Sequence, residues 1–332
     1  MDPKIAQRFH DGILREAARR YGIEPSQVRL LDGFESFMYE FERSDGAFIL
    51  RIGHSLRRTP NLVRGEVDWI NYLAAGGVGV ARAILSQDGN LVEQIDDGQG
   101  GEFICTGFVR AKEATVTRDQ LIDRFFRNYG RLLGGMHALA KKYILPNPAW
   151  KRPDWDDPLN LCVEDWLPDG ETAILKRYLP LKVHLLSLPR DRDGYGMIHQ
   201  DAHPGNFFVD NDLRITLFDF DDCIYGHFIY DIAMALFYTS MWEKDTSEFT
   251  AHFMPAFLEG YREENRLDLA WLAEIPNFLK LREIDLYAQI RFSYGDKPLD
   301  PWSERYMQDR KEKIEAGKPY IEYEWSRFRD YL

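Results

Sequence analysis

Two short runs of polar residues hold the groups in this sequence that could carry out chemistry. The first contains His199, Asp201 and Asn206, and the second begins at Asp219, thirteen positions beyond Asn206. Each run lies beside an apolar, strand-like segment. Because a buried carboxylate without a partner is costly, acids in such positions need a cation, hydrogen-bond donors or water. A hard metal ion with oxygen ligands would meet that need.

Magnesium chemistry fits the spacing of these residues. Mg²⁺ takes one or two protein oxygen ligands and completes its octahedron with water and substrate phosphates. Asn206 and Asp219 could supply those ligands, while Asp201, five positions before Asn206, could accept a proton from a hydroxyl. The order His-x-Asp-x-x-x-x-Asn followed by Asp-Phe is that of phosphoryl transfer on a kinase scaffold. The two runs therefore predict phosphoryl transfer.

On these residues the sequence resembles the family of aminoglycoside phosphotransferases, choline kinases and type II homoserine kinases, which share a two-lobed protein-kinase-like fold. The resemblance implies that Asp201 is the catalytic base and that His199 keeps the catalytic loop in shape. It implies that Asn206 and Asp219 hold Mg²⁺, with ATP as the phosphoryl donor. Asp231, in Tyr-Asp-Ile-Ala, would brace the loop from below.

The same resemblance assigns a nucleotide site to the N-terminal part of the chain. Glu66 would pair with a strand cation that touches the α- and β-phosphates. The segment Asp32–Phe37 would be the nucleotide loop, with Gly33 over the phosphates and Ser36 beside it. The hinge strand, whose backbone would meet adenine, is expected to contain Phe103, Ile104 and Thr106.

Arg51 is a departure from the family pattern, which has Lys at this strand position, here in the segment Phe48–Ile52. Arginine keeps the positive charge and can bridge a phosphate and Glu66 through its fork, but it is bulkier and its geometry differs. Arg51 is therefore assigned to the nucleotide site with Glu66. A folded pseudokinase that binds nucleotide without transferring phosphate stays open as an alternative.

The loops favour a kinase of small molecules. Gln200 stands where regulated protein kinases have Arg, and only twelve positions separate Asp219 from Asp231. That interval is too short for a long activation loop that phosphorylation could order. The nucleotide loop has one glycine, Gly33, in place of a GxGxxG motif. A Ser/Thr protein kinase-like enzyme stays open as a second alternative.

A metal-dependent hydrolase is a third alternative. His199, Asp201 and His203 alternate, so on an extended strand they would lie on one face. No further His-rich segment completes such a site. Asp221 and Asp222 have two open interpretations, as ligands of a second metal or as solvated or helix-capping acids. Residues that could line the acceptor site are Arg282, Glu283, Asp285 and Tyr287.

The elements that must position these residues change in type near residue 110. Before it, short β-prone runs surround one internal helix over 62–75 and follow an amphipathic helix over 3–21. Beyond it, a long helical pattern covers 121–143, and most of the chain after 231 is helical. We expect an α+β, two-lobed protein-kinase-like fold. Its predicted nucleotide-binding lobe spans residues 1–108, and its predicted catalytic and acceptor-binding lobe spans 109–332.

Composition limits the classes of partner. The 332 residues are 45% hydrophobic and carry a net charge of −12. A surface of that sign repels phosphodiester backbones, so we expect no nucleic-acid partner. The apolar runs fall short of the roughly 18 residues of a membrane helix, and the N-terminus lacks a signal peptide's apolar core. We therefore expect a cytoplasmic protein with no membrane partner.

The expected reaction is transfer of the γ-phosphoryl group of ATP, bound with Mg²⁺, to a hydroxyl of a small molecule. The acidic larger lobe would suit a cationic acceptor such as an aminoglycoside or choline. Homoserine and sugars stay open as acceptors, and the sequence does not indicate an oligomeric state.

Overall fold

The computed structural model describes residues 2–332 apart from 32, 34, 112–113 and 159. The chain forms two compact units, each gathered from three segments. Unit 1 comprises Met1–Thr115, Tyr143–Arg152 and Asn206–Asp221, and unit 2 comprises Val116–Lys142, Pro153–Gly205 and Asp222–Leu332. Each unit is assembled from segments far apart in the sequence, so these units do not correspond to one continuous lobe each. The predicted lobes, 1–108 and 109–332, stay a prediction.

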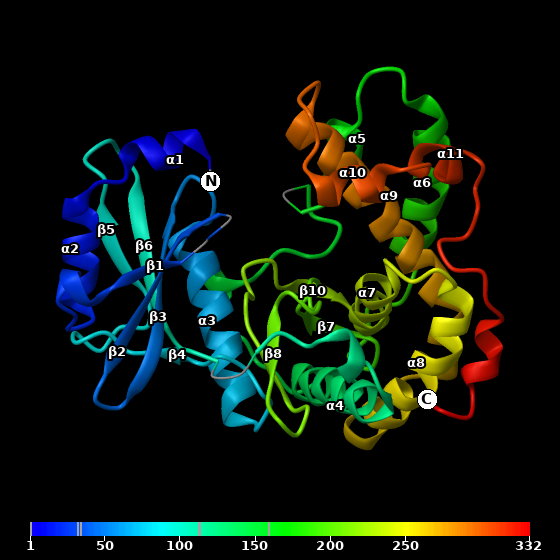
Figure 1. Cartoon of the computed structure of the whole chain (residues 1–332), viewed down its shortest axis with the longest axis horizontal. Helices are drawn as coiled ribbons and strands as arrows, with labels where there is room; N and C mark the ends of the chain where they lie inside the picture. Colours follow the sequence, from blue (N-terminus) through cyan, green and yellow to red (C-terminus); the bar gives the residue numbers. More distant parts are fainter. Residues whose placement is uncertain (1, 32, 34, 112–113, 159) are drawn as a thin grey trace. The chain divides into compact units, whose positions relative to one another are not determined.

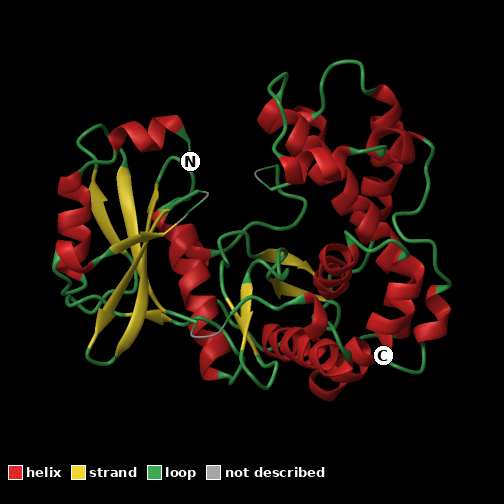
Figure 2. Cartoon of the chain, viewed as in Figure 1, coloured by secondary structure: helices red, strands yellow, loops and turns green. Residues whose placement is uncertain are grey.

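Unit 1 is built on an antiparallel sheet (Figure 2). Its described strands are β1 (Arg29–Leu31), β2 (Phe37–Arg43), β3 (Gly46–His54), β4 (Ala83–Ile84), β5 (Glu93–Asp96) and β6 (Glu102–Val109). Their order is β1-β2-β3-β6-β4, with β5 also paired to β6. The hairpin of β2 and β3 has Arg43 opposite Gly46, so a two-residue turn, Ser44 and Asp45, joins the strands. In this register Arg51 of β3 is opposite Thr106 of β6.

Helices α1 (Pro3–Arg8), α2 (Asp11–Arg20) and α3 (Pro60–Ala75) cover this sheet, and a 3₁₀ turn, Pro25–Gln27, precedes β1. Figure 1 shows α1 and α2 on one side of the sheet and α3 on the other. The apolar stripe of α2 includes Ile13 and Ala17, which are buried in one core cluster with residues of the sheet. Burial of that stripe attaches the helix to the sheet.

The expectation of one helix over 3–21 is wrong, because the chain breaks at Phe9 and His10. His10 is extended, and its Nδ1 accepts a hydrogen bond of 3.1 Å from the Gly12 N–H, which caps α2. The Phe9 ring stacks on Phe37 of β2 with centroids 3.8 Å apart. Capping and aromatic packing thus outweigh continuation of the helix, although the spacing of apolar residues is helical throughout.

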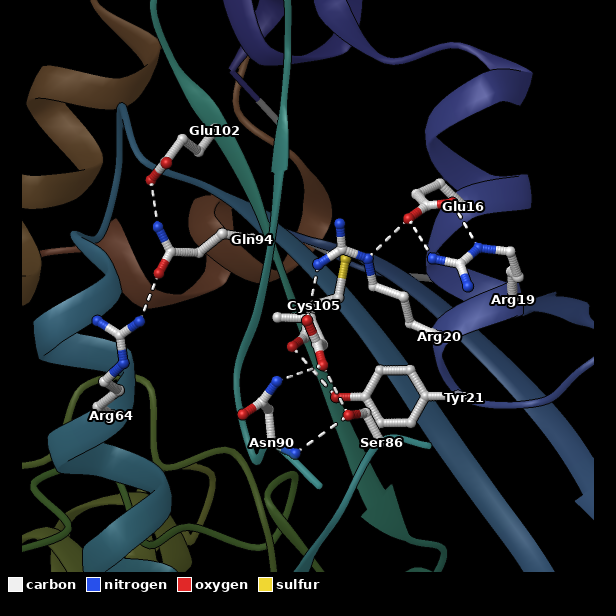
Figure 3. Close-up of polar contacts among 11 residues, drawn as sticks. Glu16, Arg19, Arg20, Tyr21, Arg64, Ser86, Asn90, Gln94, Glu102 and Cys105 are labelled. Carbon is white, nitrogen blue, oxygen red and sulfur yellow. Dashed lines mark hydrogen bonds and ion pairs between the residues drawn. The ribbon is translucent and has the colours of Figure 1, made fainter. Parts of the chain in front are cut away.

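A polar network joins α2 to the strand β5 (Figure 3). Arg20 donates to Glu16 at 2.8 Å and to Glu93 at 2.7 Å. The other oxygen of Glu93 accepts from Ser86 at 2.6 Å and from Asn90 at 3.0 Å. Both oxygens of this buried carboxylate therefore have donors, which a buried charge requires. The network fixes α2 against the sheet and lies apart from the predicted site residues in the sequence.

Unit 1 also holds the antiparallel pair β8 (Phe207–Val209) and β9 (Ile215–Leu217). The Ala81 N–H donates to the Leu217 carbonyl at 2.8 Å, and the Leu217 N–H donates to Gly79 at 2.9 Å. A Cβ on Gly79 would lie 2.3 Å from the Ile215 carbonyl oxygen, so only glycine allows this approach. These bonds secure the segment that carries Asp219 to the N-terminal part of the chain.

Unit 2 is mainly helical (Figure 2). Its described helices are α4 (Asp123–Ala140), α5 (Val163–Trp166), α6 (Thr172–Leu186), α7 (Phe228–Ser240), α8 (Thr246–Glu264), α9 (Ile275–Tyr294), α10 (Pro301–Met307) and α11 (Arg310–Glu315). The strands β7 (Tyr195–Ile198) and β10 (Ile224–His227) pair antiparallel. Short 3₁₀ turns cover Arg118–Gln120, Leu269–Glu274 and Trp325–Phe328, and Pro148–Trp150 in unit 1 is another. Among the described helices, none combines the length and apolar character needed to cross a lipid bilayer.

Helices α4 and α8 cross at glycines. A Cβ on Gly130 would lie 1.9 Å from the Phe257 carbonyl oxygen, and one on Gly134 would lie 2.6 Å from that of Tyr261. In return, a Cβ on Gly260 would lie 2.0 Å from the Arg127 carbonyl oxygen. The two backbones therefore approach more closely than any larger side chain allows. This crossing sets the distance between α4 and α8.

We expect Gly130→Ala to lower the free energy of unfolding by about 2 kcal/mol or more, because the added methyl must push α8 away from α4. Thermal or urea unfolding of the purified variant measures this change. The control Lys142→Ala, at an exposed position two residues beyond the same helix, should stay within about 0.5 kcal/mol of wild type. Equal stability of Gly130→Ala and wild type would contradict the close crossing.

Candidate active site

The loop that follows β7 carries the predicted base. His199 is fully buried, and its Nδ1 accepts a hydrogen bond of 3.3 Å from the Asp201 N–H. The residue between them, Gln200, has φ of +70°, a left-handed conformation that is uncommon for a residue other than glycine. Such a backbone persists only where its surroundings hold it in place. The loop is therefore bent sharply just before Asp201.

Asp231 of α7 holds this bend. Its Oδ1 accepts the Gln200 N–H at 2.7 Å, and its Oδ2 accepts the His199 N–H at 3.0 Å. The Asp231 side chain is fully buried, so neither bond competes with water. Two consecutive backbone donors thus share one carboxylate, which provides the brace that the family resemblance implies. A further bond, from the Tyr129 hydroxyl to the Ala202 carbonyl, secures the other side of Asp201.

The Asp201 carboxylate lies between two basic side chains of unit 2. His203 Nε2 is 3.3 Å from one oxygen, and Arg282 is 3.5 Å from the other. Burial alone would raise the pKa of Asp201, but the hydrogen bond from His203 and the charges of His203 and Arg282 lower it well below its usual value. Asp201 is therefore ionised at neutral pH and can accept a hydrogen bond from a hydroxyl.

Arg282 is itself held in place. It donates to Asp285 at 2.9 Å and to the Tyr238 hydroxyl at 3.1 Å, and its side chain is 13% exposed. The sequence predicts Arg282 and Asp285 only as lining of the acceptor site. Nothing in the spacing links Arg282 to Asp201, 81 positions away. Because His203 binds Asp201 and the His199 ring caps the turn, these residues do not form the three-residue metal face expected for a hydrolase.

The two predicted metal ligands lie in unit 1, at the same end of the β8–β9 pair. Asn206 directly precedes β8 and Asp219 follows β9 by two positions, and the Phe218 N–H donates to the Asn206 carbonyl at 2.9 Å. Asp219 has φ of +63°, again left-handed. A carboxylate and an amide oxygen are donors that a hard divalent cation prefers, so this pair fits Mg²⁺. Their role as ligands stays a prediction.

Arg51 and Glu66 form a buried ion pair in unit 1. The Arg51 fork binds both carboxylate oxygens of Glu66, at 2.7 and 2.8 Å, and its Nε donates to Thr106 Oγ1 at 3.2 Å. Arg51 is 8% exposed and Glu66 is fully buried. Burial would raise the pKa of Glu66, but the charge and hydrogen bonds of Arg51 lower it. The stability from this pair is therefore present at neutral pH and is lost as pH falls through the folded-state pKa.

The predicted adenine-binding strand requires a correction at Phe103 and Ile104, while adenine contact at Thr106 stays a prediction. Ile104 of β6 is paired with Gly53 of β3 on one side and with Gln94 of β5 on the other, and Phe103 is likewise flanked. In an antiparallel sheet the N–H and C=O of each residue face a neighbouring strand. The backbone at Phe103 and Ile104 is therefore already paired within the sheet and cannot meet adenine. Spacing alone does not show which stretch of a strand is paired on both sides.

The nucleotide loop is described only in part, because Asp32 and Phe34 lie outside the described residues. A Cβ on Gly33 would lie 2.3 Å from the Ser36 carbonyl oxygen, so the loop needs glycine there. Ser36 lines a small cavity with Arg51 and neighbouring residues. Contact of Gly33 and Ser36 with nucleotide stays a prediction.

Arginines that sequence reasoning missed surround Asp221. Arg57 and Arg58 both pair with its Oδ2, Arg58 at 3.2 Å, and Arg152 donates to its backbone carbonyl at 2.5 Å. Asp221 is therefore neither a helix cap nor a solvated acid in this structure. The Arg57-Arg58 pair is visible in the sequence, but no pattern connects it to an acid more than 160 positions away.

The antiparallel sheet unit, the helical unit and the braced Asp201 loop define a phosphotransferase with a protein-kinase-like fold. Residues 26–275 match the sequence pattern of the phosphotransferase enzyme family, and this chain belongs to that family. Among curated proteins, the amicoumacin kinase of Bacillus subtilis (strain 168) is 36% identical over 328 residues, which is 97% of each chain.

Solved structures agree with this assignment. An amicoumacin kinase in complex with AMP-PNP, Ca²⁺ and Ami is 34% identical, with a TM-score of 0.94 over 99% of this chain and 100% of that chain. A microcompartment-associated aminopropanol kinase has a TM-score of 0.73 at 24% identity over 92% and 96% of the two chains, which shows a shared fold. The protein is thus a kinase of small molecules. AMP-PNP and Ca²⁺ in the relative are consistent with ATP as donor and a divalent metal as cofactor.

We expect Arg51→Met to lower the free energy of unfolding by about 3 kcal/mol, because it leaves the Glu66 carboxylate buried without its main cation. The double variant Arg51→Met/Glu66→Leu should regain most of that loss. Chemical denaturation of both variants at neutral pH measures the difference. A double variant no more stable than the single one would show that the ion pair is not the main contribution.

Proposed function

We propose that this protein transfers the γ-phosphoryl group of MgATP to a hydroxyl of amicoumacin or a closely related small molecule. The similarity to two amicoumacin kinases over nearly the whole of each chain carries this proposal. The matched length includes unit 2, where Asp201 and its neighbours lie, as well as the sheet of unit 1. The motifs alone did not single out this acceptor among the small molecules that the family phosphorylates.

In this proposal Asp201 accepts the hydrogen bond of the acceptor hydroxyl. Its lowered pKa makes it a weak base, so it orients the hydroxyl and takes the proton late. This timing suits a loose transition state, in which the bond to the transferred phosphoryl group is largely broken before the new bond forms. Arg282 and His203 hold the carboxylate in one direction, and positioning of this kind contributes much of the rate.

On the nucleotide side, Arg51 would contact the α- and β-phosphates while Glu66 holds its guanidinium in one orientation. The planar guanidinium fork suits phosphate oxygens as well as carboxylate oxygens. Asn206 and Asp219 would hold the metal. When bound, Mg²⁺ supplies positive charge at the β- and γ-phosphate oxygens.

The test is ADP release with amicoumacin as acceptor, with choline and homoserine for comparison. We expect turnover with amicoumacin to exceed turnover with the other two. Asp201→Asn should lower that turnover by about 10² to 10⁴, because the amide cannot accept the proton, and should leave ATP affinity within about twofold. The exposed Asp169→Asn is the control and should match wild type.

Either of two outcomes would count against the proposal. Wild-type turnover in Asp201→Asn would remove Asp201 from the reaction. Faster turnover of choline or homoserine than of amicoumacin would leave a small-molecule kinase but replace the proposed acceptor.

Calorimetric titration with ATP, with and without Mg²⁺, tests the metal ligands. We expect tight binding that requires Mg²⁺, and binding to Asp219→Ala that is at least about tenfold weaker, because one of two protein oxygen ligands is lost. Asp88→Ala, an exposed acid in unit 1, is the control. Binding that is indifferent both to Mg²⁺ and to Asp219 would rule out the proposed metal site.

A further inference from the structure

The carboxylate that braces the catalytic loop is linked to two other helices of unit 2, directly to α4 and through α4 to α8. His137 of α4 is fully buried, and its Nε2 lies 3.2 Å from Asp231 Oδ2. Its Nδ1 lies 2.9 Å from the hydroxyl of Tyr261 on α8. Asn265, at the end of α8, places its amide nitrogen 2.8 Å from the same hydroxyl. A continuous chain of hydrogen bonds thus runs from Asn265 to the loop that carries Asp201.

Donor chemistry fixes the direction of this chain. The amide nitrogen of Asn265 can only donate, so the Tyr261 oxygen accepts there, and its single hydrogen goes to His137 Nδ1. Burial raises the pKa of Tyr261, so the hydroxyl keeps its proton. Burial likewise lowers the pKa of His137, so the ring is neutral. The one ring proton must then be on Nε2, where it is donated to Asp231.

With the proton on Nε2, His137 donates to Asp231, and the same carboxylate also accepts the N–H groups of His199 and Gln200. A His137 ring with its proton on Nδ1 would present a lone pair to the Asp231 carboxylate and repel it. Asp231 accepts the N–H of Gln200 at 2.7 Å, and Gln200 is the left-handed residue directly before Asp201. A shift of the Asp231 carboxylate would therefore release the bend and turn the Asp201 side chain.

We propose that Tyr261 and Asn265 are positioning residues for the catalytic loop, acting through the tautomer of His137 and the carboxylate of Asp231. The inference rests on the proposed role of Asp201. Tyr261 and Asn265 contact neither Asp201 nor the loop in any described hydrogen bond, so their effect must pass through His137.

A purely structural role for Tyr261 makes a different prediction. The carbonyl of Tyr261 lies against Gly134, and its ring packs edge-to-face on His137 with centroids 5.6 Å apart. Tyr261→Phe keeps the backbone and the ring and removes only the hydroxyl. If α8 merely packs on α4, this variant will lose stability at most and its kcat will match wild type well below the unfolding temperature.

We expect Tyr261→Phe to lower kcat about tenfold and to leave KM for ATP within about twofold, because the base is misdirected while the nucleotide residues of unit 1 are untouched. The matched control is Thr250→Val on the same helix, which removes a hydroxyl that, among the described residues, donates to the Thr246 carbonyl alone. This control should keep the wild-type kcat. Wild-type kcat in Tyr261→Phe, or a change confined to KM for ATP, would overturn the proposal.

A second measurement needs no acceptor. Amide hydrogen exchange of His199 and Gln200, whose N–H groups Asp231 accepts, should be at least about tenfold faster in Tyr261→Phe than in wild type or Thr250→Val. The ¹⁵N chemical shifts of His137 should show a neutral ring with its proton on Nε2 in wild type. Unchanged exchange, or a proton on Nδ1, would overturn the proposal.

Turnover of Asp201→Asn and amide exchange in Tyr261→Phe together separate failure of the inference from failure of the proposed function. If Asp201→Asn keeps its turnover while Tyr261→Phe speeds exchange at Gln200, then the network is real and Asp201 is not the base. If Asp201→Asn is inactive while exchange is unchanged, then the base stands and the inference fails.

A double variant tests the route through His137. If Tyr261 acts through His137, then adding Tyr261→Phe to His137→Leu should lower kcat no further than His137→Leu alone. Full additivity of the two effects would overturn that route. Should His137→Leu fail to fold, Asn265→Ala replaces it, and its loss in kcat should be smaller than that of Tyr261→Phe.

Discussion

Two consecutive backbone N–H groups, those of His199 and Gln200, share the buried carboxylate of Asp231, and the direction of Asp201 depends on that contact. A left-handed residue such as Gln200 is unfavourable by itself, and the hydrogen bond to a buried anion offsets the cost. The carboxylate in turn needs a partner, because an isolated buried charge would be more costly than the bend it stabilises. His137 is that partner.

The position of the candidate base therefore depends on how the helices of unit 2 pack. Helix α7 is apolar and almost wholly buried, so Asp231 is carried into the interior by its neighbours. The glycine crossing of α4 and α8 brings His137 and Tyr261 within hydrogen-bond distance of each other. The chemistry of the loop thus depends on contacts that involve no reacting group.

Unit 1 also buries a carboxylate, that of Glu66, and pairs it with the guanidinium of Arg51. Arg51 replaces the usual lysine, and its planar fork binds both oxygens of Glu66 while Nε reaches Thr106. A lysine ammonium has three donors but no planar fork, so it would not fix the orientation of the carboxylate as the arginine does. The same unit holds Asp221 between Arg57 and Arg58, directly after the Asp-Phe pair of the predicted metal site.

The sequence by itself determined which residue types stand at which spacing, and these were enough to predict the fold class, the phosphotransferase family and the candidate base. It also predicted the pairing of Glu66 with a strand cation, because the family pattern links those two positions. The pattern could not show the break at His10, which depends on a cap and a stacked ring. Nor could it show that both neighbouring strands pair with Ile104.

Only the tertiary structure decided which distant side chains meet. Arg282 beside Asp201, Arg57 beside Asp221 and Tyr261 beside His137 are each separated by 80 or more positions in the chain. Their contacts follow from how helices and strands pack, and packing depends on the volume and burial of many residues at once. The spacing of residues in the sequence indicates only which nearby residues can act together. The direction of Asp201, and the groups that hold it there, arise from the fold.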